Sequence, residues 1–413
     1  MTSATQAAGV LSFEQADETV RQYCRNVPHP QSETVSLTAS LGRVLAEEVR
    51  ADRGLPPFPR STRDGYAVRA ADVATFPVKL HVLGQIKAGG TFAGSVQPGQ
   101  TVEIMTGAAV PEGADAVVMV EYSSAAGDQV EIQRAVSAGE NVVAAGAEAS
   151  AGDLLLHPGA RLGPAQIAMS AAVGRANIKV YRKPRVAVLS TGDELVDVSE
   201  TPTPHQIRNS NSYSLCAQII QADGKPLQLP VAPDEEGKLT TLIHAGLETA
   251  DLLLLSGGVS MGKFDLVEMV LNKLGAQFFF TGALIQPGRP VVFGKIRKAS
   301  REIPFFGLPG NPVSVMTTFD LFVRPLLDAL SGAPPRRTPS VSARLKKPLK
   351  TKTGLTRFLP AILEGGLYDP AVEIVPWQGS GDLLAASRAN CYLIIPPDRE
   401  SIPEGEMITV VMR

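Results

Sequence analysis

The spacing of hydrophobic positions changes along the chain and predicts several kinds of structure. Four apolar residues between positions 13 and 23 recur at helical spacing behind a Ser12–Gln15 capping-box pattern, so we expect a short amphipathic helix. Between residues 51 and 149, Gly and Pro interrupt short Val-rich runs such as ADAVVMVEY, which is typical of a β-domain. A helical pattern returns in residues 157–176.

From about residue 183 the pattern alternates between strand and helix. RVAVLS, DLLLLS and PVVFGKI have the composition of buried strands, and amphipathic runs that end in Gly separate several of them. This alternation predicts a doubly wound α/β domain with a mainly parallel sheet. Such sheets bind ligands beyond the carboxyl ends of their strands.

The remaining boundaries follow from composition. SGAPPRRTPS at residues 331–340 resembles a linker, and the segment after it has the size of a small β-domain. We therefore predict a multidomain α/β plus β protein. Its parts are a helical linker domain (1–50 and 150–182), a β-rich domain (51–149), an α/β domain (183–331) and a C-terminal β-domain (340–413).

Composition excludes several classes of function. At 413 residues the chain is too long for one core, and 44% apolar with 19% charged residues indicates a folded protein. A net charge of −2 gives no general attraction to nucleic acid or anionic membrane. The N-terminus lacks the features of a signal peptide, and no apolar run approaches the roughly 20 residues of a membrane span. We expect a cytoplasmic protein with neither nucleic acid nor membrane as partner.

Cysteine and histidine offer little for a metal site. Cys24, Cys216 and Cys391 are far apart without a CxxC pair, and the five histidines contain no HxxxH pair. A bound metal would therefore depend on carboxylates, which favours Mg²⁺. The basic run RLKKPLKTK at 344–352 is either a solvated β-edge or an anion-binding patch.

The stretch SGGVSMGKFD at 256–265 imitates a phosphate-binding P-loop. Residues 257–263 satisfy G-x-x-x-x-G-K, but Phe264 stands where a Ser or Thr would ligate Mg²⁺. Asp265 would add negative charge beside the γ-phosphate. A nucleotide hydrolase is therefore disfavoured. An anion-binding turn of another family is preferred, and a merely tight turn is the remaining alternative.

Polar residues follow several of the predicted strands. Each acid alone is commonly a cap or a solvated side chain, but together they suggest a Mg²⁺ site beside a phosphate site; they are Asp193, Glu194, Asp234 and Asp265. Asn311 is expected as a helix N-cap with Pro312 at the first helical position, so the helix start would offer free N–H groups to an anion. Arg289 suits bidentate contact with an oxyanion.

At these residues the chain resembles a known family. STGDEL (190–195), SGGVSMGKFD (256–265), QPGRPVVFG (286–294) and GLPGNPVS (307–314) resemble the molybdopterin-binding domain of the MoeA/gephyrin E-domain family, the molybdopterin molybdenumtransferases. LPPFPRSTRDGYAVRAAD (55–72) and IMTGAAVPEGADAVV (104–118) resemble its N-terminal signatures, and QGS (378–380) resembles an element of its C-terminal domain. The resemblance covers nearly the whole chain in order.

The resemblance implies a four-part homodimer with a C-terminal β-barrel. It implies an active cleft shared between the α/β domain of one subunit and the DGYA loop of the other. The implied reaction is Mg²⁺-dependent insertion of molybdate into adenylylated molybdopterin, with release of AMP. Implied protein partners are the molybdopterin adenylyltransferase and apo-molybdoenzymes.

The resemblance also assigns roles to individual residues. Catalytic roles fall to Asp64, Glu194, Asp234 and Asp265, and metal binding to Asp193, Glu194, Asp234 and Asp265. Substrate contacts fall to Thr106, Thr191, Gly192, Ser256, Gly257, Gly258, Ser260, Arg289, Pro309, Gly310, Asn311 and Ser380. An Asx-turn before Gly65 is the alternative role of Asp64, and turn formation is the alternative role of Thr106.

The chain departs from the family pattern at several positions. Gln286 and Val143 stand where the family carries Lys and Arg, and each lost cation would weaken a desolvated anion contact by about 1.5–3 kcal/mol. Glu148 and Asn209 each replace an Asp. Arg208 and Lys263 are candidates to restore the charge. The alternative function is therefore a divergent, non-catalytic relative that binds or delivers the pterin cofactor, or acts as a scaffold.

Overall fold

The structure is a computed structural model that describes residues 9–258, 266–366 and 368–413. It divides into two compact units. The larger comprises Met1–Glu33, Gly42–Ala46 and Lys179–Arg413, and the smaller comprises Thr34–Leu41 and Glu47–Ile178. The chain passes between them through β2 (Ser32–Ser36) and β13 (Asn177–Tyr181).

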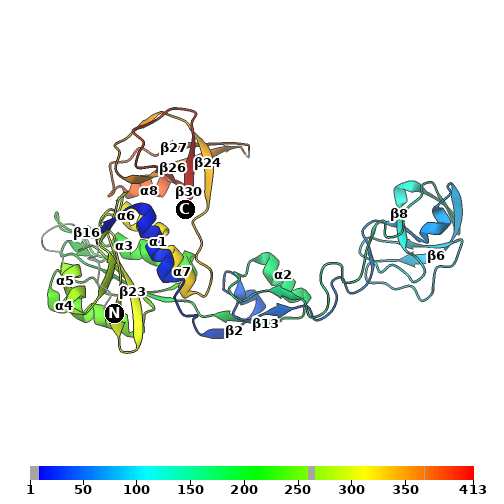
Figure 1. The fold of residues 1–413 in the computed structure, drawn as a ribbon, viewed down its shortest axis with the longest axis horizontal. Helices are drawn as coiled ribbons and strands as arrows, with labels where there is room; N and C mark the ends of the chain where they lie inside the picture. Colours follow the sequence, from blue (N-terminus) through cyan, green and yellow to red (C-terminus); the bar gives the residue numbers. More distant parts are fainter. Residues whose placement is uncertain (1–8, 259–265, 367) are drawn as a thin grey trace, which may run out of the picture. The chain divides into compact units, whose positions relative to one another are not determined.

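A six-stranded sheet forms the centre of the larger unit (Figure 1). Its order is β17-β14-β18-β23-β22-β19, with the first four strands parallel and β22 antiparallel to both of its neighbours, β23 and β19. The strands are β14 (Arg185–Ser190), β17 (Lys225–Gln228), β18 (Leu252–Ser256), β19 (Gln277–Phe280), β22 (Val292–Lys298) and β23 (Arg301–Leu308). The predicted doubly wound, mainly parallel sheet is confirmed.

The central strands β14 and β18 are apolar except at their ends because both faces of the sheet are covered. Successive side chains point to opposite faces. Val186 and Leu254 therefore join one core cluster, while Ala187 and Leu253 join the other. Helices α1 (Phe13–Cys24), α3 (Ser210–Gln221), α6 (Pro312–Thr318) and α7 (Arg324–Leu330) supply the first cluster, and α4 (Glu236–Thr249) and α5 (Leu266–Lys273) the second.

The last helical run differs from the expected single helix. A π-helical turn at Phe319–Val323 separates α6 from α7. Pro325 lies in the first turn of α7 and has no N–H to donate to the carbonyl four residues earlier. A wider turn before the proline accommodates that missing bond without ending the helical run.

The C-terminal domain is a closed five-stranded barrel. Strand β26 pairs with both β27 and β28, which leaves the barrel without a free edge at that point. Its strands are β24 (Ser340–Leu345), β26 (Thr356–Gly366), β27 (Asp369–Ile374), β28 (Cys391–Ile395) and β30 (Met407–Met412), with α8 (Leu383–Arg388) beside them. Lys346 and Lys347 pair with acids of β26 and β27, which favours the solvated β-edge over an anion-binding patch.

Short strand pairs complete the larger unit. β1 pairs with β20, β15 with β16, β25 with β29, and β21 with β26. Their bounds are β1 (Val10–Leu11), β15 (Leu195–Val196), β16 (Ile207–Arg208), β20 (Gly282–Ala283), β21 (Ile285–Gln286), β25 (Leu349–Lys350) and β29 (Ser401–Ile402).

The smaller unit is built on a second six-stranded sheet, of order β8-β5-β7-β6-β10-β9. Its strands are β5 (Gly65–Val68), β6 (Val78–Ile86), β7 (Gln100–Ile104), β8 (Ala116–Met119), β9 (Ser123–Ala126) and β10 (Gln129–Ile132). Strands β3 (Val49–Arg50) and β12 (Leu154–Leu156) pair, as do β4 (Arg60–Ser61) and β11 (Val142–Val143), and α2 (Pro164–Ala172) lies nearby in sequence.

The described residues show the state of the cysteines, the lengths of the helices and the cap of α1. All three cysteines are free thiols. Among the helices that the structure describes, none is long and apolar enough to span a membrane. The predicted capping box at the start of α1 is present, with Ser12 and Gln15 as its two members. The four domain limits expected from the sequence remain a prediction.

Gly65 is expected to be essential for the smaller unit. A Cβ at this position would lie 1.9 Å from the carbonyl oxygen of Val118, so the paired strands would have to separate. We predict that Gly65→Ala destabilises this unit by about 3 kcal/mol or more, measured as a lower midpoint of its unfolding transition. Gly237→Ala, at a helical position with open space around it, is the matched control and should not lower stability. An unchanged midpoint for Gly65→Ala would contradict the prediction.

Candidate active site

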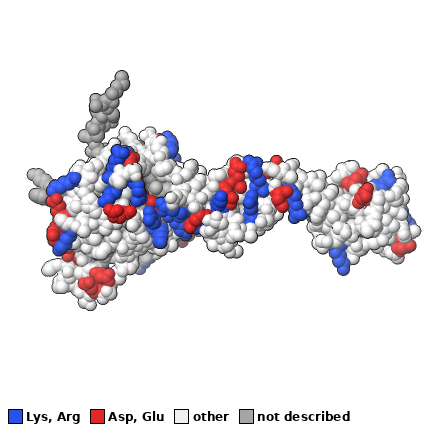
Figure 2. All heavy atoms as spheres, turned by 90° about the horizontal axis from the view of Figure 1, so that it is seen from below, with Lys and Arg blue, Asp and Glu red and all other residues white. Residues whose placement is uncertain are grey.

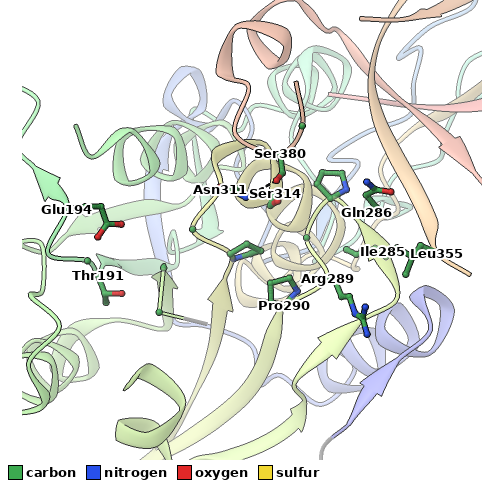
Figure 3. Close-up of a pocket in the computed structure, with 18 of the residues that line it drawn as sticks. Thr191, Glu194, Ile285, Gln286, Arg289, Pro290, Asn311, Ser314, Leu355 and Ser380 are labelled. Atoms are coloured by element: carbon green, nitrogen blue, oxygen red, sulfur yellow. Dashed lines mark hydrogen bonds between the residues drawn. The ribbon is translucent and has the colours of Figure 1, made fainter. Parts of the chain in front are cut away.

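A cavity of about 580 Å³ lies at the carboxyl ends of β14, β18 and β23 in the larger unit. The loops that follow these strands contribute Thr191, Gly257 and Pro309 to its wall. Figure 3 shows Thr191 and Glu194 on one side and Gln286, Ile285 and Leu355 on the other, with Asn311, Ser314 and Ser380 between them. The cavity thus occupies the edge that a parallel sheet offers to ligands.

Most of the predicted site residues line this cavity. They are Thr191, Gly192, Glu194, Asp234, Gly257, Gly258, Arg289, Pro309, Gly310, Asn311 and Ser380. Asp193 and Ser256 lie next to it in sequence but are not in its wall. Ser260, Lys263 and Asp265 lie outside the described residues. Asp64 and Thr106 belong to the smaller unit.

The start of the glycine turn requires glycine for steric reasons. Gly257 and Gly258 both have positive φ. A Cβ on Gly257 would lie 2.6 Å from the Thr191 carbonyl oxygen, and one on Gly258 would lie 2.7 Å from Val267. The loop after β18 is therefore packed against the loop after β14. Within the described structure, Thr191 Oγ1 is buried in this contact and has no hydrogen-bond partner.

Asn211 holds the strand ends beneath the cavity together. Its Nδ2 donates to Ser256 Oγ at 3.0 Å and to the Gly310 carbonyl oxygen at 2.7 Å. Asn209, where the family has Asp, is the N-cap of α3, and its Oδ1 accepts the Ser212 N–H. Asn and Asp are equivalent in that role, so this departure preserves the helix start.

The backbone N–H groups at the start of α6 are not all free, contrary to the expectation from the sequence. Pro312 takes the first helical position as predicted, and Asn311 takes the cap position, but the Asn311 side chain makes no capping bond. Its Nδ2 donates instead to Ser380 Oγ at 2.7 Å, and the Val313 N–H donates to the Ser380 carbonyl oxygen at 3.0 Å. The expectation of free N–H groups is thus wrong for Val313. The reason is a loop of the C-terminal barrel, which caps the helix from 69 residues away.

Carboxylates lie at the side of the cavity opposite Gln286 and Leu355 (Figure 3). Asp193 Oδ1 accepts the Asp234 N–H at 3.0 Å. Burial raises the pKa of Asp234, and the carboxylates of Asp193 and Glu194 raise it further. Among the described residues these three acids form no ion pair, and no group of three or more His, Cys, Asp or Glu is arranged as a metal cage. An uncompensated carboxylate cluster fits Mg²⁺, which is often held by one or two carboxylates together with water and substrate phosphates.

The two positions that lost a cation each face an arginine on the paired strand. Gln286 in β21 is the register partner of Arg357 in β26, which is 7% exposed and whose pKa is lowered by burial. Val143 in β11 is the register partner of Arg60, whose guanidinium lies 3.1 Å from Glu148. A guanidinium stays charged even when its pKa falls. An arginine thus lies in register with each position, although neither Arg357 nor Arg60 lines the cavity.

Arg208 does not replace the missing cation. Its side chain is exposed, its Nε donates to the Glu200 carbonyl oxygen at 3.0 Å, and it does not line the cavity. Lys263, the other candidate, lies outside the described residues.

Asp64 and Thr106, considered separately in the sequence, are in direct contact. Asp64 Oδ1 accepts the Thr106 N–H at 2.6 Å and the Thr106 hydroxyl at 2.7 Å, and these bonds lower the pKa of Asp64. The hydrogen bonds recorded for this carboxylate go to Thr106, which is not the pattern of an Asx-turn. The carboxylate is fully exposed, and its second oxygen remains available.

Sequence reasoning missed the apolar part of the cavity wall. Ile285, Leu355, Trp377 and the prolines on either side of Gly288–Arg289 contribute to it. Trp377 is the single tryptophan of the chain, and it also packs against Val313 and Met316 of α6. Its position directly before the QGS motif was the sequence feature that could have indicated a role in the site.

Comparison with known proteins identifies the family of the chain. Three family models cover nearly the whole chain: the MoeA N-terminal region (domain I and II) at residues 11–174, a "probable molybdopterin binding domain" at 187–329, and the MoeA C-terminal region (domain IV) at 342–412. The chain belongs to the MoeA family. The family resemblance and the predicted fold class are confirmed.

Family relatives match along their full length. The chain is 34% identical over 407 residues to the molybdopterin molybdenumtransferase of Bacillus subtilis, covering 96% of this chain and 93% of that protein. It is 34% identical over 400 residues to that of Haemophilus influenzae, covering 95% and 97%. The crystal structure of a molybdopterin biosynthesis MoeA protein from Pyrococcus horikoshii matches with a TM-score of 0.81 at 29% identity, covering 98% of this chain and all of that one.

The Thr106 hydroxyl is predicted to control the ionisation of Asp64. Thr106→Val removes one of the two hydrogen bonds that favour the carboxylate, so the pKa of Asp64 should rise toward its ordinary value. Thr106→Ser keeps a hydroxyl and should hold the pKa low. Carbon-detected NMR titration of the Asp64 carboxyl measures both. Equal pKa values in the wild type and Thr106→Val would show that the hydroxyl does not act on this group.

Proposed function

We propose that the chain catalyses Mg²⁺-dependent insertion of molybdate into adenylylated molybdopterin, with release of AMP, in molybdenum cofactor biosynthesis. The single observation that supports this reaction is the composition of the cavity. One opening at the sheet edge joins a glycine turn, a guanidinium, an apolar wall and an acidic cluster. Relatives of matching length bear the name molybdopterin molybdenumtransferase, so both molybdate and molybdopterin are expected substrates.

Each part of the cavity suits one part of those substrates. The turn at Gly257–Gly258 and the unpartnered Thr191 hydroxyl would face a phosphate of the incoming nucleotide conjugate. Arg289 would bind the tetrahedral oxyanion through paired N–H donors. Trp377 and Leu355 would cover the flat pterin ring and exclude water from it.

Glu194 and Asp234, together with Asp193 and Asp265, would hold Mg²⁺ in this proposal. The ion would supply positive charge to phosphate oxygens at the point where the phosphoanhydride breaks. Burial and the carboxylates of Asp193 and Glu194 raise the pKa of Asp234, and a bound cation would favour its charged form. Its backbone N–H bond to Asp193 fixes the loop that carries it.

The proposal includes a homodimer in the cytoplasm. The exposed DGYA loop of one subunit would present Asp64 to the cavity of the other, and Thr106 fixes the direction of that carboxylate. A molybdopterin adenylyltransferase would supply the substrate, and apo-molybdoenzymes would accept the product.

Arg289 provides the first test. Arg289→Ala should raise the molybdate concentration needed for half-maximal AMP release by about 10- to 100-fold. The reason is that a charge-assisted contact contributes roughly 1.5–3 kcal/mol. Arg289→Lys should be intermediate, since it keeps the charge and loses the bidentate geometry. The measurement is AMP release from adenylylated molybdopterin as a function of molybdate concentration. Fluorescence of the single tryptophan reports pterin binding independently of turnover.

Arg388→Ala, on the exposed end of α8, is the matched control and should behave as the wild type. Pterin binding by fluorescence without any AMP release from the wild type would instead identify a non-catalytic cofactor carrier. Equal molybdate dependence in Arg289→Ala and the wild type would contradict the assigned anion contact.

Mg²⁺ binding has a test that does not depend on turnover. Mg²⁺ should raise the melting temperature of the wild type by a few degrees and have no effect on Asp234→Asn. Because the folded-state pKa of Asp234 is raised, its ionisation lowers stability as pH rises through the window above the unfolded pKa. Without Mg²⁺ at neutral pH, Asp234→Asn should therefore be at least as stable as the wild type.

Asp197→Asn serves as the matched control, since this exposed carboxylate bonds Ser199 and does not line the cavity. It should keep the full Mg²⁺ response. A response that survives in Asp234→Asn would remove this residue from the metal site.

A further inference from the structure

A second opening lies in the larger unit, far from the cavity described above. It is a groove of about 1380 Å³ that we call the basic groove. Its cations are Arg182, Lys183, Arg185, Lys225, Lys295 and Arg301. Its acids are Glu33, Asp251 and Glu302, so the lining carries an excess of positive charge although the whole chain is slightly negative.

The basic groove lies at the opposite edge of the central sheet from the active-site cavity. Strand β14 begins at Arg185 in the groove and is followed by Thr191 in the cavity. Strand β18 is preceded by Asp251 and followed by Gly257 in the same way. A strand of five or six residues spans roughly 17–20 Å, so one ligand of ordinary size cannot fill both openings.

One buried carboxylate organises the cations. Asp251 forms a bidentate pair with Arg182 at 2.9 Å and 2.9 Å, and lies 3.4 Å from Arg301 and 3.6 Å from Arg185. Arg182, the Arg185 N–H and the neighbouring guanidinium of Arg185 lower the pKa of Asp251. Three positively charged guanidinium groups thus surround one carboxylate, so positive charge exceeds negative charge by two at this point.

The cations of the groove differ in how far contacts within the protein already use their charge. Arg301 caps the end of α4 through the Ala250 carbonyl oxygen, and Lys183 and Lys295 pair with Asp223 and Glu302. Lys225 is exposed, is the register partner of Arg185 on the adjacent strand, and forms no ion pair within the described structure. Arg185 Nε has no hydrogen-bond partner among the described atoms. Lys225 therefore offers positive charge to an outside partner, whereas the Arg185 guanidinium lies beside Asp251.

The facing wall of the groove is polar and conformationally restricted. It consists of the outer side of α1 and the segment after it, which contributes Gln22, Asn26 and Gln31 as amide groups. Pro28 and Pro30 restrict the backbone of this segment. Side-chain amides both donate and accept, which suits the N–H and C=O groups of an extended peptide.

We propose that the basic groove is the docking site for an extended, acidic segment of a partner protein. The groove exceeds the roughly 300–1,000 Å³ of small-molecule sites, which favours a chain over a small anion. Acidic side chains complement its charge, and such complementarity steers association. Docking at this edge leaves the active-site cavity open, so a partner and the pterin substrate can be bound together.

Nucleic acid fits the groove less well. Binding of single strands relies on aromatic faces on which bases stack. The Tyr23 ring already packs against Phe279 at 5.5 Å and Phe293 at 5.4 Å, and His29 is stacked on Tyr181 at 5.5 Å. Lys and Arg side chains are also interspersed with Asp and Glu over the face drawn in Figure 2, without a continuous basic field.

The test uses the full chain and three labelled probes. They are a 12-residue peptide rich in Glu, the same peptide with every Glu replaced by Lys, and a 12-nucleotide single strand. Fluorescence anisotropy at two salt concentrations measures binding. We expect the acidic peptide to bind in a salt-dependent manner and the basic peptide not to bind. Lys225→Glu and Ser300→Glu both place negative charge in the groove. Each should lower the affinity for the acidic peptide by about tenfold or more.

Lys350→Glu changes the same kind of exposed cation outside the groove, in β25, and should bind the peptide as the wild type does. AMP release should be unaffected in Lys225→Glu, because this residue lies at the other edge of the sheet. Three results would overturn the proposal. One is an affinity for the acidic peptide that neither Lys225→Glu nor Ser300→Glu changes. Another is binding of the oligonucleotide as tightly as the peptide. The third is conversion of a wild-type dimer to monomer by Lys225→Glu in sedimentation, which would make the groove a contact between two copies of the chain.

Discussion

One side-chain amide holds together the strand ends on which the active site depends. Asn211 donates to Ser256 at the end of β18 and to Gly310 in the loop after β23, at 3.0 Å and 2.7 Å. Backbone bonds support the same spacing, because the Thr191 N–H donates to the Ser256 carbonyl oxygen at 2.9 Å and the Gly257 N–H donates to that of Leu308 at 3.2 Å. The same contact brings Gly257 against Thr191, where a side chain at position 257 has no room. The geometry of the cavity wall follows from this close packing.

The cavity that results separates opposite charges. Glu194 lies on one side and Arg289 lies apart from it, with Asn311 and Ser380 between them (Figure 3). If the two groups were adjacent they would neutralise each other as an ion pair and would present little charge to a ligand. Because they are apart, the acidic side can attract a cation while the other side attracts an oxyanion. Burial raises the pKa of Asp234, and the neighbouring carboxylates of Asp193 and Glu194 contribute to the rise.

The sequence predicted the parts of the site that a repeating backbone geometry determines. Parallel strands bring their carboxyl ends to one edge, so Thr191, Gly257 and Pro309 could be grouped from strand positions alone. It could not predict contacts between distant segments whose register is unknown. The Ser380 loop that caps α6 is 69 residues from its partner, and Thr106 is 42 residues from Asp64. The apolar wall at Trp377 was missed for the same reason, and the π-turn at Phe319–Val323 was missed because helical periodicity continues through it.

The departures from the family pattern illustrate why a motif alone does not give the charge of a site. Counted by position, Gln286 and Val143 remove two cations. Counted by register, Arg357 stands opposite the first and Arg60 stands opposite the second. Residues in register on paired strands are near neighbours, so each arginine lies close to the position of the departure. Arg60 is also balanced by Glu148, which is itself one of the departures, so the changes at positions 143 and 148 belong to one rearranged ion pair. A linear motif therefore counts charges without saying where their side chains lie, and at neither position does the neighbouring arginine enter the cavity wall.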